Sequence, residues 1–335
     1  FQSGIGSSTY QNLELVRKLS DDVAVTWESS RPDVISGTGK VTLPKEDTKV
    51  TMTAVISRGS AAVKKEYTTT VMAKGLDAIN TEEGLEASYS FDDSELSNAK
   101  NSSESATLLS RGTSSRPVQR EDSDRGSKVL HTDKGNSTSN SYVQINNPLK
   151  GKNTAGATVS LWVKCDDNNV WGEIWSFFDD NKSRLFLTQN AFLGYNYNDG
   201  EVYFDCNNGA TVTNAIGSGK WRLVTVSIDR DGYGIYIDGE MKYNKQQNAA
   251  FAGTSGYDEA MGNRLLDLFN TSNHFYIGYG GYWGSGALFV DNLKIYSAAL
   301  GNAEISKLYQ EEKTKMVSDL SLIHISEPTR RRGIS

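Results

Sequence analysis

Residues 220–243 read KWRLVTVSIDRDGYGIYIDGEMKY. Between Val224 and Ile228, apolar residues alternate with Thr and Ser, which is the period-2 pattern of a half-buried strand. Asp231-Gly232 and Asp238-Gly239 enclose a second short apolar run. Asp-Gly pairs favour tight hairpin turns, because glycine tolerates the positive φ that such turns require. The stretch therefore predicts an antiparallel meander, and an all-β fold is the first hypothesis.

The composition of the whole chain agrees with an all-β fold. Its 335 residues include 31 Gly and 16 Tyr but only 5 Pro, which suits many tight turns, and the length leaves room for two domains. The formal net charge of -6 argues against a general affinity for nucleic acid. No apolar run approaches the ~18 residues of a membrane span. We therefore expect no nucleic-acid partner and no insertion into a membrane.

Residues 12–74 form a first unit of short alternating strands. Within it, TWESSRPDVISGTGKVTLP (residues 26–44) resembles the atrophied bacterial immunoglobulin-like domain, in which T-W-x-S-S-x-P-x-V-I-S precedes G-x-V-T. The resemblance implies an immunoglobulin-like β-sandwich that serves as a spacer. Trp27 shares the parity of Val25, so we expect it in the core and not against a sugar. Residues 1–11 are rich in Gly and Ser and are expected to be disordered.

A linker at residues 75–84 leads to a second unit, residues 85–312. Its distinctive stretches are Tyr89–Asp93 (YSFDD), Ser160–Lys164 (SLWVK), Gly286–Leu300 and Ala303–Tyr309. With the meander, they resemble the laminin-G-like, or concanavalin A-like, jelly roll, which implies a second β-sandwich. Elsewhere in this unit we expect long loops around one strand at residues 94–128. We also expect a helical turn within 249–269 and a short helix after Leu300.

The two ends of the chain carry features that bear on the origin of the sequence. It begins at Phe1 without Met or a signal peptide, so we expect a fragment whose export signal is not included. Residues 320–330, LSLIHISEPTR, resemble the translation of a sequencing adaptor. We therefore expect residues 313–335 to be a disordered tail that is artefactual from about residue 320 onward.

The two cysteines, Cys165 and Cys206, occupy strand positions whose parity is shared with apolar residues. We expect two buried thiols, and a disulfide between them is the alternative. Neither their spacing nor their neighbours suggest a metal site.

A calcium site is expected where the first and last strands of the jelly roll meet. Asp92 ends the first strand and Asp291 lies in the last, and these strands are neighbours in a jelly roll. Ca²⁺ prefers several oxygen ligands, including carboxylates. The resemblance implies a structural Ca²⁺ held by acidic residues at these places. The alternative is that both carboxylates cap strands and accept hydrogen bonds from loop amides.

A sugar-binding platform is expected in turns and at strand ends that combine aromatic residues with Asn or Asp. Aromatic faces stack on sugars, and the amide and carboxylate groups bind hydroxyls. The candidates are Trp171, Tyr195, Tyr197, Tyr282 and Trp283. The alternative is that these rings pack under long loops. Three other tryptophans lie within strand patterns and are expected in the core: Trp162, Trp175 and Trp221.

No catalytic residues are predicted. Glycoside hydrolysis requires two carboxylates at a set separation, and 41 acidic residues make chance pairs unavoidable. The chain has no H-E-x-x-H, G-x-S-x-G or P-loop motif.

The two resemblances together imply a function. They suggest a non-catalytic, lectin-like carbohydrate-binding module with a spacer, from a secreted or surface-bound bacterial multimodular polysaccharide-degrading enzyme. The partner would be a polysaccharide or glycan, and the module would be a monomer tethered to other domains. One alternative is a cell-surface adhesin that binds host glycan or protein. Another is glycoside hydrolase activity, of arabinan or xylan type, in a domain missing here.

Overall fold

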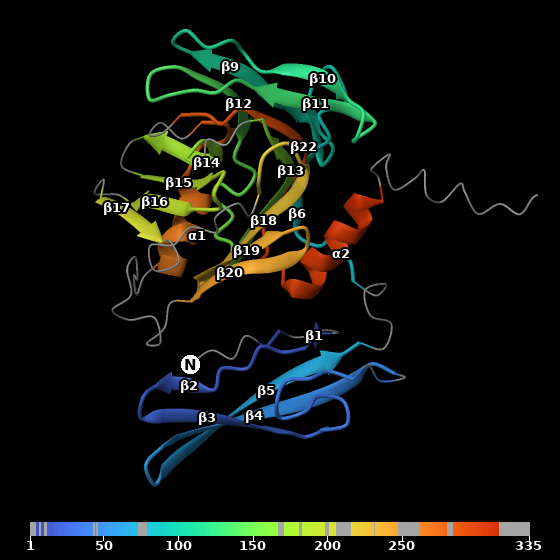
Figure 1. Cartoon of the computed structure of the whole chain (residues 1–335), viewed down its shortest axis with the longest axis vertical. Helices are drawn as coiled ribbons and strands as arrows, with labels where there is room; N and C mark the ends of the chain where they lie inside the picture. The colour runs from blue at the N-terminus through green and yellow to red at the C-terminus, as the bar shows by residue number, and fades with distance from the viewer. Residues whose placement is uncertain are drawn as a thin grey trace, which may run out of the picture.

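The fold is described from a computed structural model. It describes residues 5–6, 8–9, 12–42, 44, 46–72, 79–166, 171–180, 183–197, 201–205, 216–230, 232–246, 261–279 and 284–314. Strands dominate the described residues, which confirms the all-β prediction, and they form one domain near the N-terminus and a larger second domain (Figure 1). No helix among these residues is long and apolar enough to cross a membrane.

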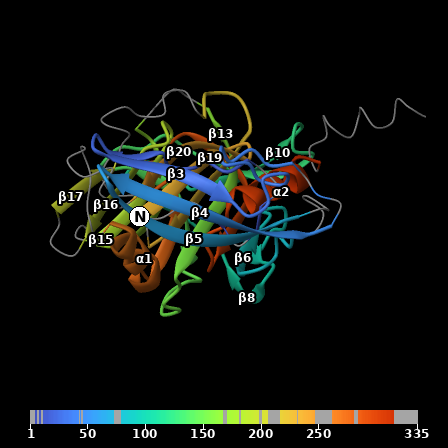
Figure 2. The ribbon, with the colours of Figure 1, turned by 90° about the horizontal axis from the view of Figure 1, so that it is seen from below.

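The first domain is built on one sheet. Its strands are β1 Ser8–Thr9, β2 Lys18–Ser20, β3 Val23–Ser29, β4 Thr48–Arg58 and β5 Ala61–Val71. Their order is β1-β5-β4-β3-β2, with β1 parallel to β5 and the other pairs antiparallel. Figure 2 shows the long strands β3, β4 and β5 side by side.

The core of the first domain follows the alternation in the sequence. Val25 and Trp27 are buried with Val50 and Met52 of the neighbouring strand, and the Trp27 indole N–H donates to the Val16 carbonyl at 2.8 Å. The core position expected for Trp27 is therefore confirmed. Between β3 and β4, Val41 forms a single antiparallel bridge with Ile35.

The second domain is a sandwich of two large sheets. The eight-stranded sheet has the order β10-β11-β22-β13-β18-β19-β20, with β6 also paired to β22. Its strands are β6 Leu85–Tyr89, β10 Val118–Asp122, β11 Ser127–Thr132, β13 Gly156–Cys165, β18 Arg222–Asp229, β19 Gly232–Ile237, β20 Glu240–Gln246 and β22 Leu288–Tyr296. The first and last strands are neighbours, as predicted.

The seven-stranded sheet has the order β17-β16-β15-β14-β21-β12-β9. Its strands are β9 Thr107–Arg111, β12 Asn140–Asn146, β14 Glu173–Asp180, β15 Ser183–Thr188, β16 Leu193–Tyr197, β17 Glu201–Asp205 and β21 His274–Ile277. A separate hairpin pairs β7 Ser97–Asn98 with β8 Asn101–Ser105. Residues 94–128 therefore hold several short strands and not one. They escaped prediction because they are polar, mostly exposed and lack apolar alternation.

Two helices complete the second domain, and both were expected. Helix α1, Met261–Thr271, places its apolar side chains in the core between the sheets. Helix α2, Asn302–Lys313, covers the outer face of the eight-stranded sheet through Ile305 and Leu308. The core tryptophans Trp162, Trp175 and Trp221 are all buried, as predicted. Cys165 is also buried, and Cys206 lies outside the described residues.

The meander β18-β19-β20 lies at one edge of the eight-stranded sheet, and it forms as predicted. Val224 and Val226 face the core between the sheets. The polar residues on the opposite face of β18 are not in solvent, because Thr225 is 1% and Ser227 is 7% exposed. The Ser227 hydroxyl donates to the Leu300 carbonyl at 2.8 Å. The prediction of a half-buried strand was therefore wrong, since the segment leading into α2 covers its polar face.

Candidate functional site

Aromatic side chains gather on the outer face of the seven-stranded sheet. In β12, Val143 and Ile145 belong to the core, so the alternating Tyr142 points to the other face. The same alternation in β21 buries Phe275 and turns Tyr276 outward. Successive strands thus place their rings on one surface of the sheet.

The cluster contains Tyr142, Phe178, Tyr276 and Tyr279, and we call it the aromatic face. The Tyr142 and Tyr279 rings are stacked, with centroids 4.6 Å apart and planes at 24°. Tyr276 meets Tyr279 edge-on at 5.4 Å, and Phe178 meets Tyr279 edge-on at 5.6 Å. Tyr142, Phe178 and Tyr279 are half-buried, so their rings keep some accessible surface.

A backbone turn after β21 brings Tyr279 over Tyr142. Gly278 has a φ of 79°, and its N–H donates to the Ile174 carbonyl at 2.8 Å. A Cβ at this position would lie 3.0 Å from the Ser141 carbonyl oxygen. The Ser176 hydroxyl donates to the Tyr279 carbonyl and fixes the residue after the turn. The stacked pair is therefore held by the backbone as well as by ring contact.

Polar groups border the aromatic face. The exposed Arg111 of β9 donates from Nη1 to the Tyr279 hydroxyl at 3.4 Å, and the His274 ring lies 5.9 Å from that of Tyr276. Burial raises the pKa of Tyr142; Tyr279 adds to the rise and Arg111 opposes it. The Tyr142 phenol is therefore neutral at physiological pH and can both donate and accept a hydrogen bond.

The five aromatic residues proposed from the sequence differ in their exposure to solvent, and some of them lie outside the described residues. Trp171 is 41% exposed and meets Phe192 edge-on at 5.7 Å. Tyr195 is 1% exposed and belongs to the core, so its ring does not face solvent. Tyr197 lies in β16, but its side chain is outside the described residues. Tyr282 and Trp283 also lie outside them.

The sequence predicted the sugar-binding rings in turns and at strand ends, whereas Tyr142, Phe178 and Tyr276 lie within strands. A signal was present in the sequence. In YVQI (residues 142–145) and HFYI (residues 274–277), an aromatic ring occupies the parity opposite to the core residues. Outward aromatic residues on neighbouring strands form a contiguous patch, and such patches mark binding surfaces.

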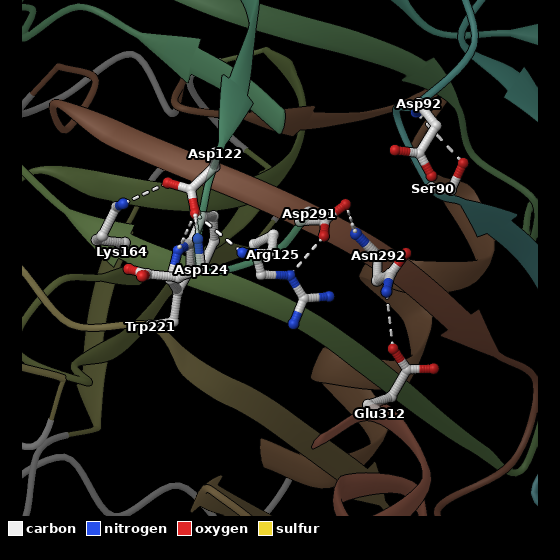
Figure 3. A network of polar contacts seen from close by, with 10 residues as sticks. All are labelled: Ser90, Asp92, Asp122, Asp124, Arg125, Lys164, Trp221, Asp291, Asn292 and Glu312. Atoms are coloured by element: carbon white, nitrogen blue, oxygen red, sulfur yellow. Dashed lines mark hydrogen bonds and ion pairs between the residues drawn. The ribbon is translucent and has the colours of Figure 1, made fainter. Parts of the chain in front are cut away.

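The two acidic residues proposed to bind calcium lie in different surroundings: Asp92 follows β6, and Asp291 lies within the neighbouring strand β22. Asp92 is exposed, and its backbone N–H donates to the Ser90 hydroxyl at 3.3 Å. Asp291 is 1% exposed and bonds to Arg125 and Asn292 (Figure 3). Within the part of the chain that the structure describes, no three His, Cys, Asp or Glu side chains are grouped to hold a metal ion.

These surroundings do not fit a calcium ion at Asp291. Both oxygens of its carboxylate already accept hydrogen bonds from nitrogen donors, and a cationic guanidinium is one of the donors. Ca²⁺ needs six to eight oxygen ligands. Calcium binding by the chain stays a prediction.

The fold defines an all-β protein whose larger domain is a sandwich of two sheets. Two family models match the chain: the atrophied bacterial Ig domain over residues 4–74, and the concanavalin A-like lectin/glucanases superfamily over residues 136–306. The second match spans half of the chain. The chain therefore belongs to the concanavalin A-like lectin/glucanases superfamily, and it carries an atrophied bacterial Ig domain in front.

Solved structures of similar fold come from several proteins. Domain 4 of AbnA, a GH43 extracellular arabinanase from Geobacillus stearothermophilus solved with arabinotriose, is 18% identical with a TM-score of 0.49; the match covers 68% of this chain and 98% of that one. The binding domain of Paraclostridial Mosquitocidal Protein 1 is 16% identical with a TM-score of 0.49, covering 69% and 53%. The receptor-binding domain of botulinum neurotoxin C/D mosaic serotype is 14% identical with a TM-score of 0.44, covering 68% and 51%.

This chain spans about half the length of the two toxin binding domains. No protein of curated function matches it in sequence.

Proposed function

We propose that the second domain is a non-catalytic glycan-binding module and that the aromatic face is its binding surface. The first domain would act as a spacer, and the parent protein would be a secreted or surface-bound bacterial enzyme that degrades polysaccharide. A module of this kind raises the local substrate concentration for a tethered catalytic domain, so modest affinity suffices. Enzymatic activity within this chain is not part of the proposal.

The observation that carries the proposal is the stacked pair of Tyr142 and Tyr279 on the outer face of a sheet. Both rings are half-buried, while core residues of the same sheet are almost completely buried. A pyranose or furanose ring presents a C–H-rich face that packs on such rings, and aromatic residues bring large contact area with little loss of side-chain entropy.

The polar border of the aromatic face supplies the groups that such a ligand needs. Arg111 is exposed, and its guanidinium carries more donors than the single bond to Tyr279 uses. Gln144 lies on the same side of β12 as Tyr142 and is partly exposed. These groups can bind sugar hydroxyls around a stacked ring.

The decisive experiment compares insoluble-polysaccharide pull-down and glycan-array binding of the chain with those of a Tyr142→Ala/Tyr279→Ala variant. We expect binding to fall roughly 10- to 100-fold in the variant, because each lost stacking contact is worth about 1 kcal/mol beyond its area. Tyr142→Phe should retain most of the binding, since the ring remains.

Two matched controls locate the binding surface. Trp171→Ala removes an exposed ring at the edge of the sandwich, and Tyr67→Ala removes a half-buried ring of the first domain. Both should bind like the unaltered chain. Binding that survives in the double variant but is lost with Trp171→Ala would move the site to the loops. Failure to bind any plant, fungal or host glycan would rule out the proposed function.

A further inference from the structure

A second polar cluster lies on the opposite sheet, away from the aromatic face. Arg125 in the turn between β10 and β11 donates from Nε to Asp291 Oδ2 of β22 at 2.7 Å, and both side chains are 2% exposed (Figure 3). The guanidinium carbon lies 4.6 Å from the Trp162 ring centroid and 5.7 Å from that of Trp221. A buried charged pair of this kind costs desolvation, so its surroundings must compensate.

The turn that carries Arg125 is held in place by Asp122. Its Oδ1 accepts the backbone N–H groups of Asp124 and Arg125, both at 3.1 Å, and the indole N–H of Trp221 at 3.1 Å. Its Oδ2 is paired with Lys164 of β13. The guanidinium is therefore presented to Asp291 by a fixed backbone and not by a mobile loop.

The far side of Asp291 is also occupied. Asp291 Oδ1 accepts the backbone N–H of Asn292 at 2.9 Å, and Asn292 has a φ of 47°, in the left-handed region that Asn tolerates. The Asn292 side chain donates from Nδ2 to Glu312 Oε2 at 2.9 Å, and Lys294 Nζ bonds Glu312 Oε1 at 2.8 Å. Because Glu312 belongs to α2, the cluster joins the β10–β11 turn, the last strand and the last helix.

We propose that the side chain of Arg125 is a built-in structural cation at Asp291, in the place where the family resemblance implies calcium. The two charges of the pair balance, and the carboxylate has both oxygens engaged. A Ca²⁺ ion at the same carboxylate would meet a guanidinium within hydrogen-bonding distance and would find Asp92 turned to solvent. This inference is independent of the glycan-binding proposal.

The first test compares the unaltered chain with the Asp291→Asn variant. The melting temperature of the full chain is measured in CaCl₂ and in EDTA, beside that of Asp291→Asn. We expect the same melting temperature in both solutions for the unaltered chain. If EDTA lowers the melting temperature of the unaltered chain but not that of Asp291→Asn, calcium binds at Asp291 and the proposal is overturned. If EDTA lowers both melting temperatures equally, calcium binds elsewhere and Arg125 is the cation at Asp291.

The second test is chemical rescue. Arg125→Ala should lower the melting temperature by roughly 10 °C, because it leaves a buried carboxylate unpaired. Methylguanidinium at millimolar concentration should recover part of that loss, but should not stabilise the unaltered chain or the control Arg111→Ala. Recovery by Ca²⁺ and not by methylguanidinium would contradict the proposal.

If Arg125→Ala does not fold, an Arg125→Met/Asp291→Asn double variant tests the pairing of Arg125 with Asp291 instead. It replaces the pair with neutral groups of similar shape. It should melt close to the unaltered chain, whereas Arg125→Met alone should melt well below it. If the single and double variants lose the same melting temperature, the pairing of Arg125 with Asp291 does not stabilise the domain, and the proposal is contradicted.

Discussion

At the scale of single residues, burial decides which carboxylates can act in binding. Asp92 and Asp291 looked equivalent in the sequence, because Asp92 ends the first strand pattern of the second unit and Asp291 stands at the start of the last. In the structure one is exposed and the other is enclosed by Arg125, Asn292 and α2. Burial raises the pKa of Asp291 to about 6, and Asp92 adds to the rise, while Arg125 opposes it.

This pKa gives a prediction for the pH dependence of stability. The folded pKa of about 6 exceeds the unfolded value of 3.8, so the native state binds the proton more tightly. The Asp291 contribution to the free energy of unfolding is then fully present below about pH 4 and lost as the pH rises through 6. Relative to that of Asp291→Asn, the free energy of unfolding of the unaltered chain should fall by up to about 3 kcal/mol between pH 4 and 7. Urea unfolding across this range measures the difference, and a difference that rises with pH would contradict the assignment.

At the scale of elements, turns position helices as well as strands. Asp238-Gly239 connects β19 to β20 with φ values of 54° and 80°, as the Asp-Gly pair predicts. The Asp238 carboxylate also accepts the Leu223 N–H at 3.0 Å and pairs with Arg222 at 2.6 Å. Helix α2 packs so closely on this turn that a Cβ on Gly239 would lie 2.9 Å from the Tyr309 Cβ.

Gly239→Ala should therefore destabilise the second domain in two ways. The positive φ costs about 1 kcal/mol for a residue with a Cβ, and the clash with Tyr309 should add about 1–2 kcal/mol. Gly219→Ala is the matched control, since Gly219 has a φ of 73° but nothing within 4 Å of its Cβ position. Thermal unfolding should show a larger drop in melting temperature for Gly239→Ala than for Gly219→Ala. Equal drops would mean that α2 does not pack tightly against the turn.

At the scale of the whole molecule, the two domains bury separate cores. The core of the first domain draws on residues up to Val71, and the two clusters of the second begin at Leu85. The aromatic face and the Arg125 cluster are both built from the second domain alone. Neither site needs side chains of the first domain.

Deleting residues 1–74 should therefore leave glycan binding unchanged within twofold. The full chain should show two calorimetric transitions, and the deletion should remove one of them, because independent cores unfold independently. Differential scanning calorimetry and the same pull-down assay measure both effects. A single transition in the full chain, or lost binding in the deletion, would show that the domains act as one unit.

The sequence by itself determined the two β domains, the meander, both helices and the burial of the core tryptophans. These follow from local alternation and turn chemistry, which each segment carries within itself.

Only the tertiary structure decided which outward residues become accessible. Tyr142, Phe178 and Tyr279 meet because β12, β14 and the end of β21 lie side by side in one sheet. Tyr195 is buried because its side chain packs in the core of the second domain. The partner of Asp291 was likewise decided by topology, since Arg125 lies 166 residues away along the chain. Period-2 patterning fixes which residues share a face, but long-range pairing decides what that face meets.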